Sequence, residues 1–192
     1  MPRTLAGRVE PDRWQAVAEL ARTGLASPLT TSVGRLFDAV AALCGLPVRV
    51  SYEGQAAVEL EAAADPAERG AYPLPSDAAS FVLDARETVR ALLADADRGV
   101  GTPVLAARFH NGLAEATANA CASAAARHGV ETVVLSGGVF QNRLLLEGTA
   151  TRVLDRGLRV LVPERLPPND GGIAYGQAAV AAARMARRGD GA

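Results

Sequence analysis

The sequence contains no lysine, few aromatic residues and only two cysteines, and each scarcity limits what the protein can be. All twenty basic residues are arginine, and because 21 acidic residues balance them the formal net charge is -1. A nucleic-acid-binding domain usually carries a basic excess, which is absent here. Cys44 and Cys121 lie far apart without the spacing of a zinc site, so we expect buried free thiols and no disulfide framework.

Long apolar runs are also missing from the sequence. No stretch approaches the roughly 18 apolar residues of a membrane-spanning helix, and the N-terminus lacks the apolar run of a secretory signal. We therefore expect a cytoplasmic protein. Hydrophobic residues make up 49% of the chain but aromatic ones only 4%. This composition predicts alanine-rich helices that pack closely, within one domain.

Helical patterns dominate the first two thirds of the chain. The predicted helices run from Pro11 to near Gly24, Ser32 to Leu43, Gly54 to Ala64, Ala85 to Ala96 and Val104 to His128. In the first of them, Trp14, Val17, Leu20 and Ala21 share one face. Gly129 is expected to cap the last of them. Residues 48–50 read as a short extended stretch, and residues 71–76, with two prolines, as a loop or edge strand.

The pattern changes near residue 131. Residues 131–135 and 158–162 read as short β-strands, and each is followed by a loop and a helix, over 142–155 and from 172 to about 188. Strand, helix, strand, helix predicts parallel pairing of the strands. The expected fold class is therefore helix-rich α/β with a short parallel sheet.

The loop after the first strand carries the pattern Ser136-Gly137-Gly138. Glycines directly after a strand let the backbone approach a ligand, and the amides that begin the next helix can receive phosphate. A structural reversal explains most Gly-Gly turns, so this pattern alone leaves both readings open.

A carboxylate stands in the loop after the second strand, at Asp170. Because both loops follow parallel strands, we expect them to lie at the same edge of the sheet and to face one cleft. Asp170 could cap the final helix, or it could bind a divalent cation beside a phosphate.

Strings around these loops resemble one family closely. Residues 136–146 read Ser-Gly-Gly-Val-Phe-Gln-Asn-Arg-Leu-Leu-Leu, and residues 167–178 read Pro-Pro-Asn-Asp-Gly-Gly-Ile-Ala-Tyr-Gly-Gln-Ala. Residues 32–43, 52–61 and 107–111 match in the same order. Together they resemble the C-terminal part of the hydrogenase maturation carbamoyltransferase (HypF) family over nearly the whole chain. That family is similar to the tRNA threonylcarbamoyl-adenosine (TsaD-like) enzymes and to the O-carbamoyltransferases.

The resemblance implies a fold and a set of site residues. Residues 1–188 would form the C-terminal portion of a TsaD-like domain, part of an actin- and sugar-kinase-like (ASKHA) fold that binds ATP between two lobes, with residues 189–192 as a disordered tail. The resemblance places these residues at the nucleotide: Gly34, Asp38, Gly137, Gly138 and Asn142. It makes Asp170 a metal ligand, and it names no catalytic residue.

The resemblance also implies a reaction. The family forms carbamoyl adenylate from carbamoyl phosphate and ATP, and transfers the carbamoyl group to the C-terminal cysteine of a partner protein in nickel-iron hydrogenase maturation. The implied cofactors are ATP or carbamoyl adenylate and a divalent metal such as magnesium, zinc or iron. No nucleic-acid or membrane partner is expected.

One departure from the family leaves alternatives open. The family's metal site uses two histidines upstream of the matched region, whereas His110 and His128 here lie within a helical segment without His-x-x-x-His spacing. We therefore expect catalysis to need an N-terminal lobe supplied elsewhere. The alternatives are a non-catalytic ATP-binding or scaffold module, and an O-carbamoyltransferase acting on a small-molecule hydroxyl. A large apolar face where a lobe is missing would argue against a finished scaffold module.

Overall fold

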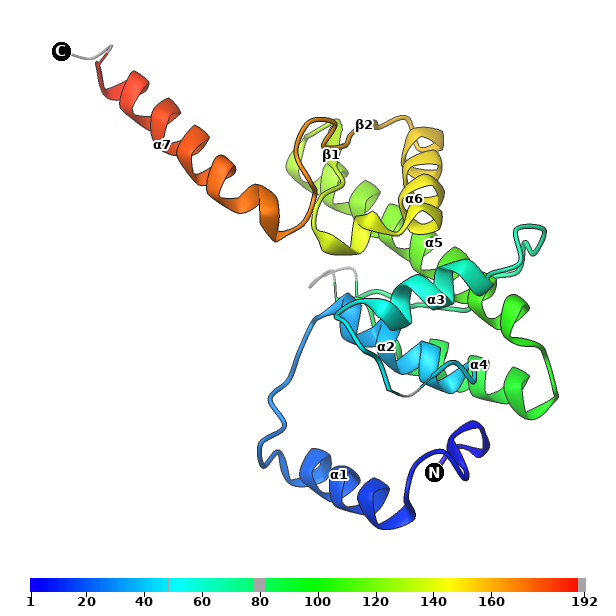
Figure 1. The fold of residues 1–192 in the computed structure, drawn as a ribbon. Helices are drawn as coiled ribbons and strands as arrows, with labels where there is room; N and C mark the ends of the chain where they lie inside the picture. Colours follow the sequence, from blue (N-terminus) through cyan, green and yellow to red (C-terminus); the bar gives the residue numbers. More distant parts are fainter. Residues whose placement is uncertain (48, 78–81, 190–192) are drawn as a thin grey trace.

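The computed structural model describes residues 1–47, 49–77 and 82–189, and Figure 1 shows their arrangement. The α-helices are α1 (Pro11–Thr23), α2 (Val33–Leu43), α3 (Gln55–Ala63), α4 (Arg86–Asp97), α5 (Thr102–His128), α6 (Arg143–Asp155) and α7 (Ile173–Gly189). The strands are β1 (Thr132–Val134) and β2 (Arg159–Leu161), and three short 3-10 turns are η1 (Arg3–Leu5), η2 (Gly138–Gln141) and η3 (Asp170–Gly172). The predicted helices and strands are confirmed.

Local signals account for the helix boundaries. The Ser32 side chain accepts a hydrogen bond from the Arg35 amide at 3.3 Å, which satisfies one free donor at the start of α2. Gly24 and Gly129 follow α1 and α5 in the left-handed conformation, with φ of 74° and 63°. Glycine adopts this conformation without the steric cost that a side chain imposes, so both helices end where the sequence predicts.

The sheet consists of β1 and β2 paired in parallel, in the register Val133 opposite Val160. The Leu135 amide continues the pairing beyond β1 by donating to the Leu161 carbonyl oxygen at 2.9 Å. Parallel pairing was predicted, and α6 provides the connection between the strands. Both following loops, around residues 136–142 and 163–172, therefore leave the sheet at the same edge.

The hydrophobic core lies around α5, where α2, α3 and α4 meet it. Phe37 of α2 and Phe109 of α5 are almost fully buried, with ring centroids 5.0 Å apart at an interplanar angle of 81°. Such an edge-to-face pair adds about 0.5–1.5 kcal/mol to the stabilisation from burial. Since α5 is rich in alanine and carries eleven buried residues, neighbouring helices approach it closely, as the composition predicts.

A polar cluster fastens the loop before α4 to α5. The Tyr72 hydroxyl and the Arg108 guanidinium each donate to Asp95 Oδ2 at 2.8 Å. Burial raises the pKa of the Asp95 carboxyl, but these hydrogen bonds and the charges of Arg98 and Arg108 together hold the pKa below its usual value. The Tyr72 amide also donates to the Arg108 carbonyl oxygen at 3.0 Å. The loop predicted at residues 71–76 thus lies directly against α5.

Three segments of the chain have few contacts or lie partly outside the described residues. Helix α1 forms as predicted, but none of its residues is buried, and Val17 is 59% exposed. Its apolar face therefore receives little cover within this chain. In the stretch predicted to be extended at residues 48–50, Arg49 and Val50 belong to no helix or strand, and Val48 lies outside the described residues. The predicted tail begins at Gly189, which ends α7, and residues 190–192 lie outside the described residues.

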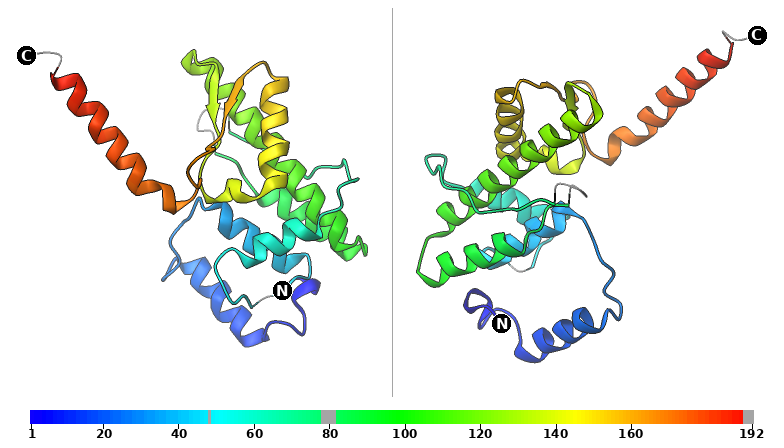
Figure 2. Two further views of the ribbon diagram at one scale, coloured as in Figure 1. Left: turned by 45° about the horizontal axis from the view of Figure 1, so that its top comes forward. Right: turned by 180° about the vertical axis from the view of Figure 1, so that it is seen from behind.

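Helix α7 extends away from the remainder of the chain in each of the views in Figures 1 and 2. Its side chains from residue 173 to 186 are all exposed, including Tyr175 at 63% and Met185 at 74%. Val134 and Leu161 of the sheet are also more than half exposed. Among the described helices, none is long and apolar enough to cross a membrane.

We predict that Gly112→Ala destabilises the protein. A Cβ atom at Gly112 would collide with the backbone of Tyr72, which packs against α5 at that point. Because backbone cannot move aside as easily as a flexible side chain, we expect a loss of about 1–3 kcal/mol, measured by urea unfolding.

Gly176→Ala is the matched control. Gly176 also lies in a helix, and a Cβ atom there would meet nothing within 4 Å. An unchanged urea midpoint for Gly112→Ala would contradict the close backbone packing.

Candidate functional site

The two loops that leave the sheet line one pocket of about 440 Å³. The first loop contributes Ser136 and Gly137, and the second contributes a longer run that includes Asp170. The expectation that both loops face one cleft is therefore confirmed. Gly138 lies beside the pocket, since a Cβ there would stand 3.8 Å from Asn169 Cβ.

Gly137 holds the first loop in a conformation that needs glycine. Its φ of 100° and ψ of 158° lie in a region that residues with a side chain rarely adopt. Its amide donates to the Pro168 carbonyl oxygen at 2.7 Å, which ties the first loop to the second. The backbone at Gly137 is thus shaped by the neighbouring loop and opens toward the pocket.

The second loop leaves the Asp170 carboxylate available. Asn169 caps the η3 turn, because its side chain accepts from the Gly171 amide at 3.0 Å. From the sequence, Asp170 is a possible cap of the final helix, and within the described residues its side chain is not bonded to any amide of α7. Within the described residues, the exposed Asp170 carboxylate makes no hydrogen bond or ion pair.

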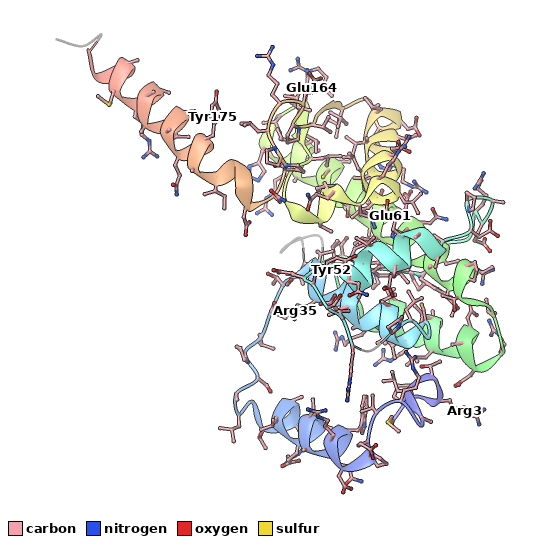
Figure 3. The ribbon with its side chains drawn as sticks, viewed as in Figure 1. Arg3, Arg35, Tyr52, Glu61, Glu164 and Tyr175 are labelled. Carbon is pink, nitrogen blue, oxygen red and sulfur yellow. The ribbon has the colours of Figure 1, made fainter. Side chains whose placement is uncertain are left out.

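The start of α6 differs from the sequence expectation. Asn142 caps the helix, with Oδ1 accepting from the Leu145 amide at 2.8 Å. Glu61, which points from α3 toward the beginning of α6 in Figure 3, accepts from the Arg143 amide at 2.7 Å and the Leu144 amide at 3.2 Å. The first amides of this helix were expected to receive a phosphate, but protein oxygens already occupy them.

Free amides remain one turn earlier. Within the described part of the chain, the amides of Gly138 and Val139 make no hydrogen bond, whereas Phe140 donates to the Gly137 carbonyl oxygen at 3.0 Å. Amide groups that lack an acceptor at a turn can bind an anionic oxygen. Any phosphate at this loop would therefore meet η2 and not α6.

Asn142 is also joined to a buried histidine. His110 Nδ1 lies 2.8 Å from the Ala106 carbonyl oxygen, which can only accept, so Nδ1 carries the proton. Nε2 then accepts from Asn142 Nδ2 at 2.9 Å. Burial lowers the pKa of His110 below its usual value of 6.5, and the Ala106 hydrogen bond and the nearby Glu61 carboxylate offset only part of this effect.

The N-terminal end of α2 lies beside η2 in all views of Figures 1 and 2. The Phe37 ring of α2 packs against His110 of α5, with ring centroids 5.3 Å apart. The neighbouring Asp38 is partly exposed, with Oδ2 3.9 Å from Arg35 Nη1. Gly34 is exposed, and a Cβ there would meet only Ser32 Oγ at 3.7 Å, so packing within this chain does not require glycine.

The described residues do not provide a complete metal site. They contain no group of three or more histidine, cysteine, aspartate or glutamate side chains that could hold an ion. His110 is buried with both ring nitrogens bonded, and His128 is exposed at the end of α5. Asp170 could therefore serve only as one ligand among others from outside this chain.

Both cysteines are free, as the sequence predicts, but only Cys44 is buried, while Cys121 is partly exposed. Burial raises the pKa of the Cys44 thiol to about 12. Burial also raises the pKa of Cys121. Burial therefore disfavours the thiolate, the reactive form, at both positions.

We predict that His110 makes the stability of the protein depend on pH just below 6.5. The folded state keeps His110 neutral, whereas the unfolded chain takes up a proton as the pH falls through 6.5, so this contribution to stability is lost toward acid. His110→Gln retains a hydrogen-bond acceptor for Asn142 but does not titrate. Between about one pH unit above and one below 6.5, its melting temperature should fall less than that of the wild type.

The carboxylates titrate equally in both proteins, so the comparison isolates His110. Equal slopes of melting temperature against pH would contradict the prediction.

The comparisons with known proteins agree with this geometry. Residues 3–177 match the family described as carbamoyltransferase, Kae1-like domain, second subdomain. The chain is 42% identical over 154 residues to carbamoyltransferase HypF of Synechocystis sp., which covers 79% of this chain and 19% of that protein. It is 40% identical over 178 residues to a carbamoyltransferase HypF homolog of Cupriavidus necator, which covers 88% of this chain and 44% of that protein.

Two solved structures share the fold. A full-length HypF in the phosphate- and nucleotide-bound form matches with a TM-score of 0.84 and 32% identity, over 93% of this chain and 24% of that one. HypF of T. kodakarensis matches with a TM-score of 0.79 and 25% identity, over 93% of this chain and 23% of that one. The chain spans less than half of each of these relatives. The helix-rich α/β fold with a short parallel sheet is that of a Kae1-like, ASKHA-type domain, and the chain belongs to the HypF carbamoyltransferase family.

Proposed function

We propose that this chain forms the nucleotide-binding part of a carbamoyltransferase active site. The observation that carries the proposal is the pocket that the Gly137 and Asp170 loops share. A glycine-lined turn with free amides and a carboxylate without a protein partner are the groups that a nucleotide with its cation would use.

The nucleotide can be oriented along this surface. We place the nucleoside at α2, where Asp38 can accept hydrogen bonds from ribose hydroxyls and Gly34 leaves space for the ring. The phosphates would extend toward η2, where Gly138 and Val139 offer their amides. The observation that no neighbour within the chain requires glycine at position 34 supports a ligand there.

Asn142 has structural contacts in addition to the nucleotide contact that the resemblance implies. Its Oδ1 and one Nδ2 hydrogen already bond Leu145 and His110, so at most one Nδ2 hydrogen remains for a ligand. A contact between Asn142 and the nucleotide therefore stays a prediction. Its observed contacts fix the position of the turn and of α6.

The proposed reaction follows the family. The bond between the carbamoyl carbon and the phosphate oxygen of carbamoyl adenylate breaks, AMP leaves, and the carbon bonds to the C-terminal cysteine sulfur of a hydrogenase maturation partner. A divalent cation would neutralise charge on the phosphate, with Asp170 as one ligand. The residues of this chain would bind the nucleotide and hold its phosphate against the η2 amides as the leaving group departs.

The unpartnered surfaces support a second lobe as a necessary part of the site. Helix α7 and the outer side of the sheet present apolar groups that include Val134, Leu161, Ile173 and Val180, each more than half exposed. A soluble module rarely leaves such residues together in water. We propose that the remaining part of the Kae1-like domain covers them and supplies the missing metal ligands.

A non-catalytic nucleotide-binding module is the second candidate. The absence of a three-residue ligand cluster among the described residues favours it if this chain acts alone. The two candidates share the nucleotide site and differ in whether an added lobe restores transfer. The third reading, transfer to a small-molecule hydroxyl, differs from the first only in the acceptor.

We predict that the purified chain binds ATP with Mg²⁺ and that Asp38→Ala weakens binding by about tenfold or more, since a hydrogen bond to a charged group contributes roughly 1.5–3 kcal/mol. Isothermal titration calorimetry measures the affinity. Asp97→Ala, which removes an exposed helical carboxylate from the end of α4, is the matched control and should bind like the wild type.

Equal affinity of Asp38→Ala and the wild type for ATP would contradict the placement of the nucleoside at α2. No binding by a folded wild-type chain would show that the site forms only with the second lobe, and the same titration would then be repeated with that lobe added.

A further inference from the structure

We infer that Glu61 is a positioning residue for the candidate nucleotide turn, acting as a built-in anion at the start of α6. Its carboxylate belongs to α3, yet Oε1 lies 2.7 Å from the Arg143 amide and 3.2 Å from the Leu144 amide, 82 and 83 residues further along the chain. The inference rests on the proposed function, because it concerns the turn proposed to bind the phosphates.

The position of Glu61 within its own helix supports this role. Glu61 lies in the last turn of α3, where the helix dipole disfavours a negative charge. The N-terminus of α6 has the opposite polarity and stabilises that charge. The preceding Leu60 is fully buried in the core and fixes the backbone from which Glu61 extends.

Glu61 and Asn142 together complete the start of α6. Glu61 accepts from the first two amides of the helix, and Asn142 Oδ1 accepts from the third, at Leu145. The Asn142 amide, the fourth free donor, bonds the Val139 carbonyl oxygen at 3.2 Å, and the Leu146 amide makes the first bond within the helix. All four donors that a helix leaves free are therefore satisfied, and α6 has none to offer a nucleotide.

This arrangement determines where a phosphate can bind. With the α6 amides occupied, the unbonded amides of the turn are those of Gly138 and Val139 in η2. The Glu61 bonds also anchor the end of the turn to α3, while His110 anchors Asn142 to α5. Glu61 thus keeps the phosphate from α6 and holds the η2 amides in place.

Anion rescue tests the inference without relying on nucleotide binding. Glu61→Ala frees the Arg143 and Leu144 amides, and we expect its melting temperature to drop by roughly 2–4 °C, the effect of losing about 1 kcal/mol at a helix start in a protein of this size. Sodium sulfate should recover most of this loss, measured against sodium chloride at equal ionic strength, because sulfate can occupy the vacated amides.

Two further variants sharpen the assay. Glu61→Gln retains an oxygen acceptor, so it should lose less stability than Glu61→Ala and respond less to sulfate. Glu147→Ala is the matched control, since Glu147 is an exposed carboxylate on α6 that pairs with the Arg143 side chain and contacts no amide there. It should respond to sulfate like the wild type.

Equal stabilisation of all four proteins by sulfate would overturn the inference. If Glu61→Ala does not fold, the comparison of Glu61→Gln with the wild type and Glu147→Ala still decides, because a vacated or weakened site must show a greater response to sulfate.

Nucleotide affinity provides the second readout. If the wild type binds ATP with Mg²⁺, Glu61→Ala should bind roughly fivefold more weakly at a temperature where both are folded, and Glu61→Gln should recover most of the affinity. Unchanged affinity in Glu61→Ala would overturn the positioning role. If the wild type binds no nucleotide even with the second lobe added, the proposed function fails, while the sulfate assay still tests whether Glu61 occupies the first amides of α6.

Discussion

Helix α5 is the constraint on which the rest of the structure depends, because the helical core and the sheet both pack against it. Helices α3 and α4 of the core contact it, and so do α6 and β1 of the sheet region. The fit is close: a Cβ added at Gly148 of α6 would stand 3.4 Å from the Ala114 methyl group. Since packed interiors accommodate even one extra carbon poorly, the alanines and glycines of these helices set the distance between core and sheet. Packing against α5 thereby fixes the position of the loops that follow the sheet relative to the helical core.

The local structure of this chain is readable from its sequence, while the contacts that build the site are not. Ser32, Gly24 and Gly129 mark helix ends by chemistry that acts within a few residues, so those boundaries follow from pattern alone. Asn142 is the first residue of the helix predicted over 142–155, and an asparagine at a helix start is itself a capping signal. Its bond to His110 spans 32 residues and depends on how α5 and α6 cross. No periodicity encodes such a crossing.

The same contrast explains the errors about individual side chains. An expectation that α6 opens with free amides treats the helix as isolated, whereas Glu61 reaches them from a helix 82 residues away. The apolar face of α1 follows the helical period correctly, but period alone does not specify a partner, and little packs against it here. Asp170 was assigned two possible parts; the neighbouring Asn169 caps the η3 turn, and the Asp170 carboxylate makes no hydrogen bond within the described residues. For the polar groups, the role that remains open depends on which of their atoms are already bonded within the chain.

The two cysteines gain a meaning from the proposed chemistry. A carbamoyl group destined for a partner's sulfur would be wasted if a thiol of the protein itself captured it. Cys44 lies in the core, and burial raises its pKa to about 12, which disfavours the thiolate. Burial also raises the pKa of the Cys121 thiol. Under the proposed function, this chain would hold an activated acyl group while remaining chemically silent toward it, so that the thiolate of the partner is the nucleophile that reacts.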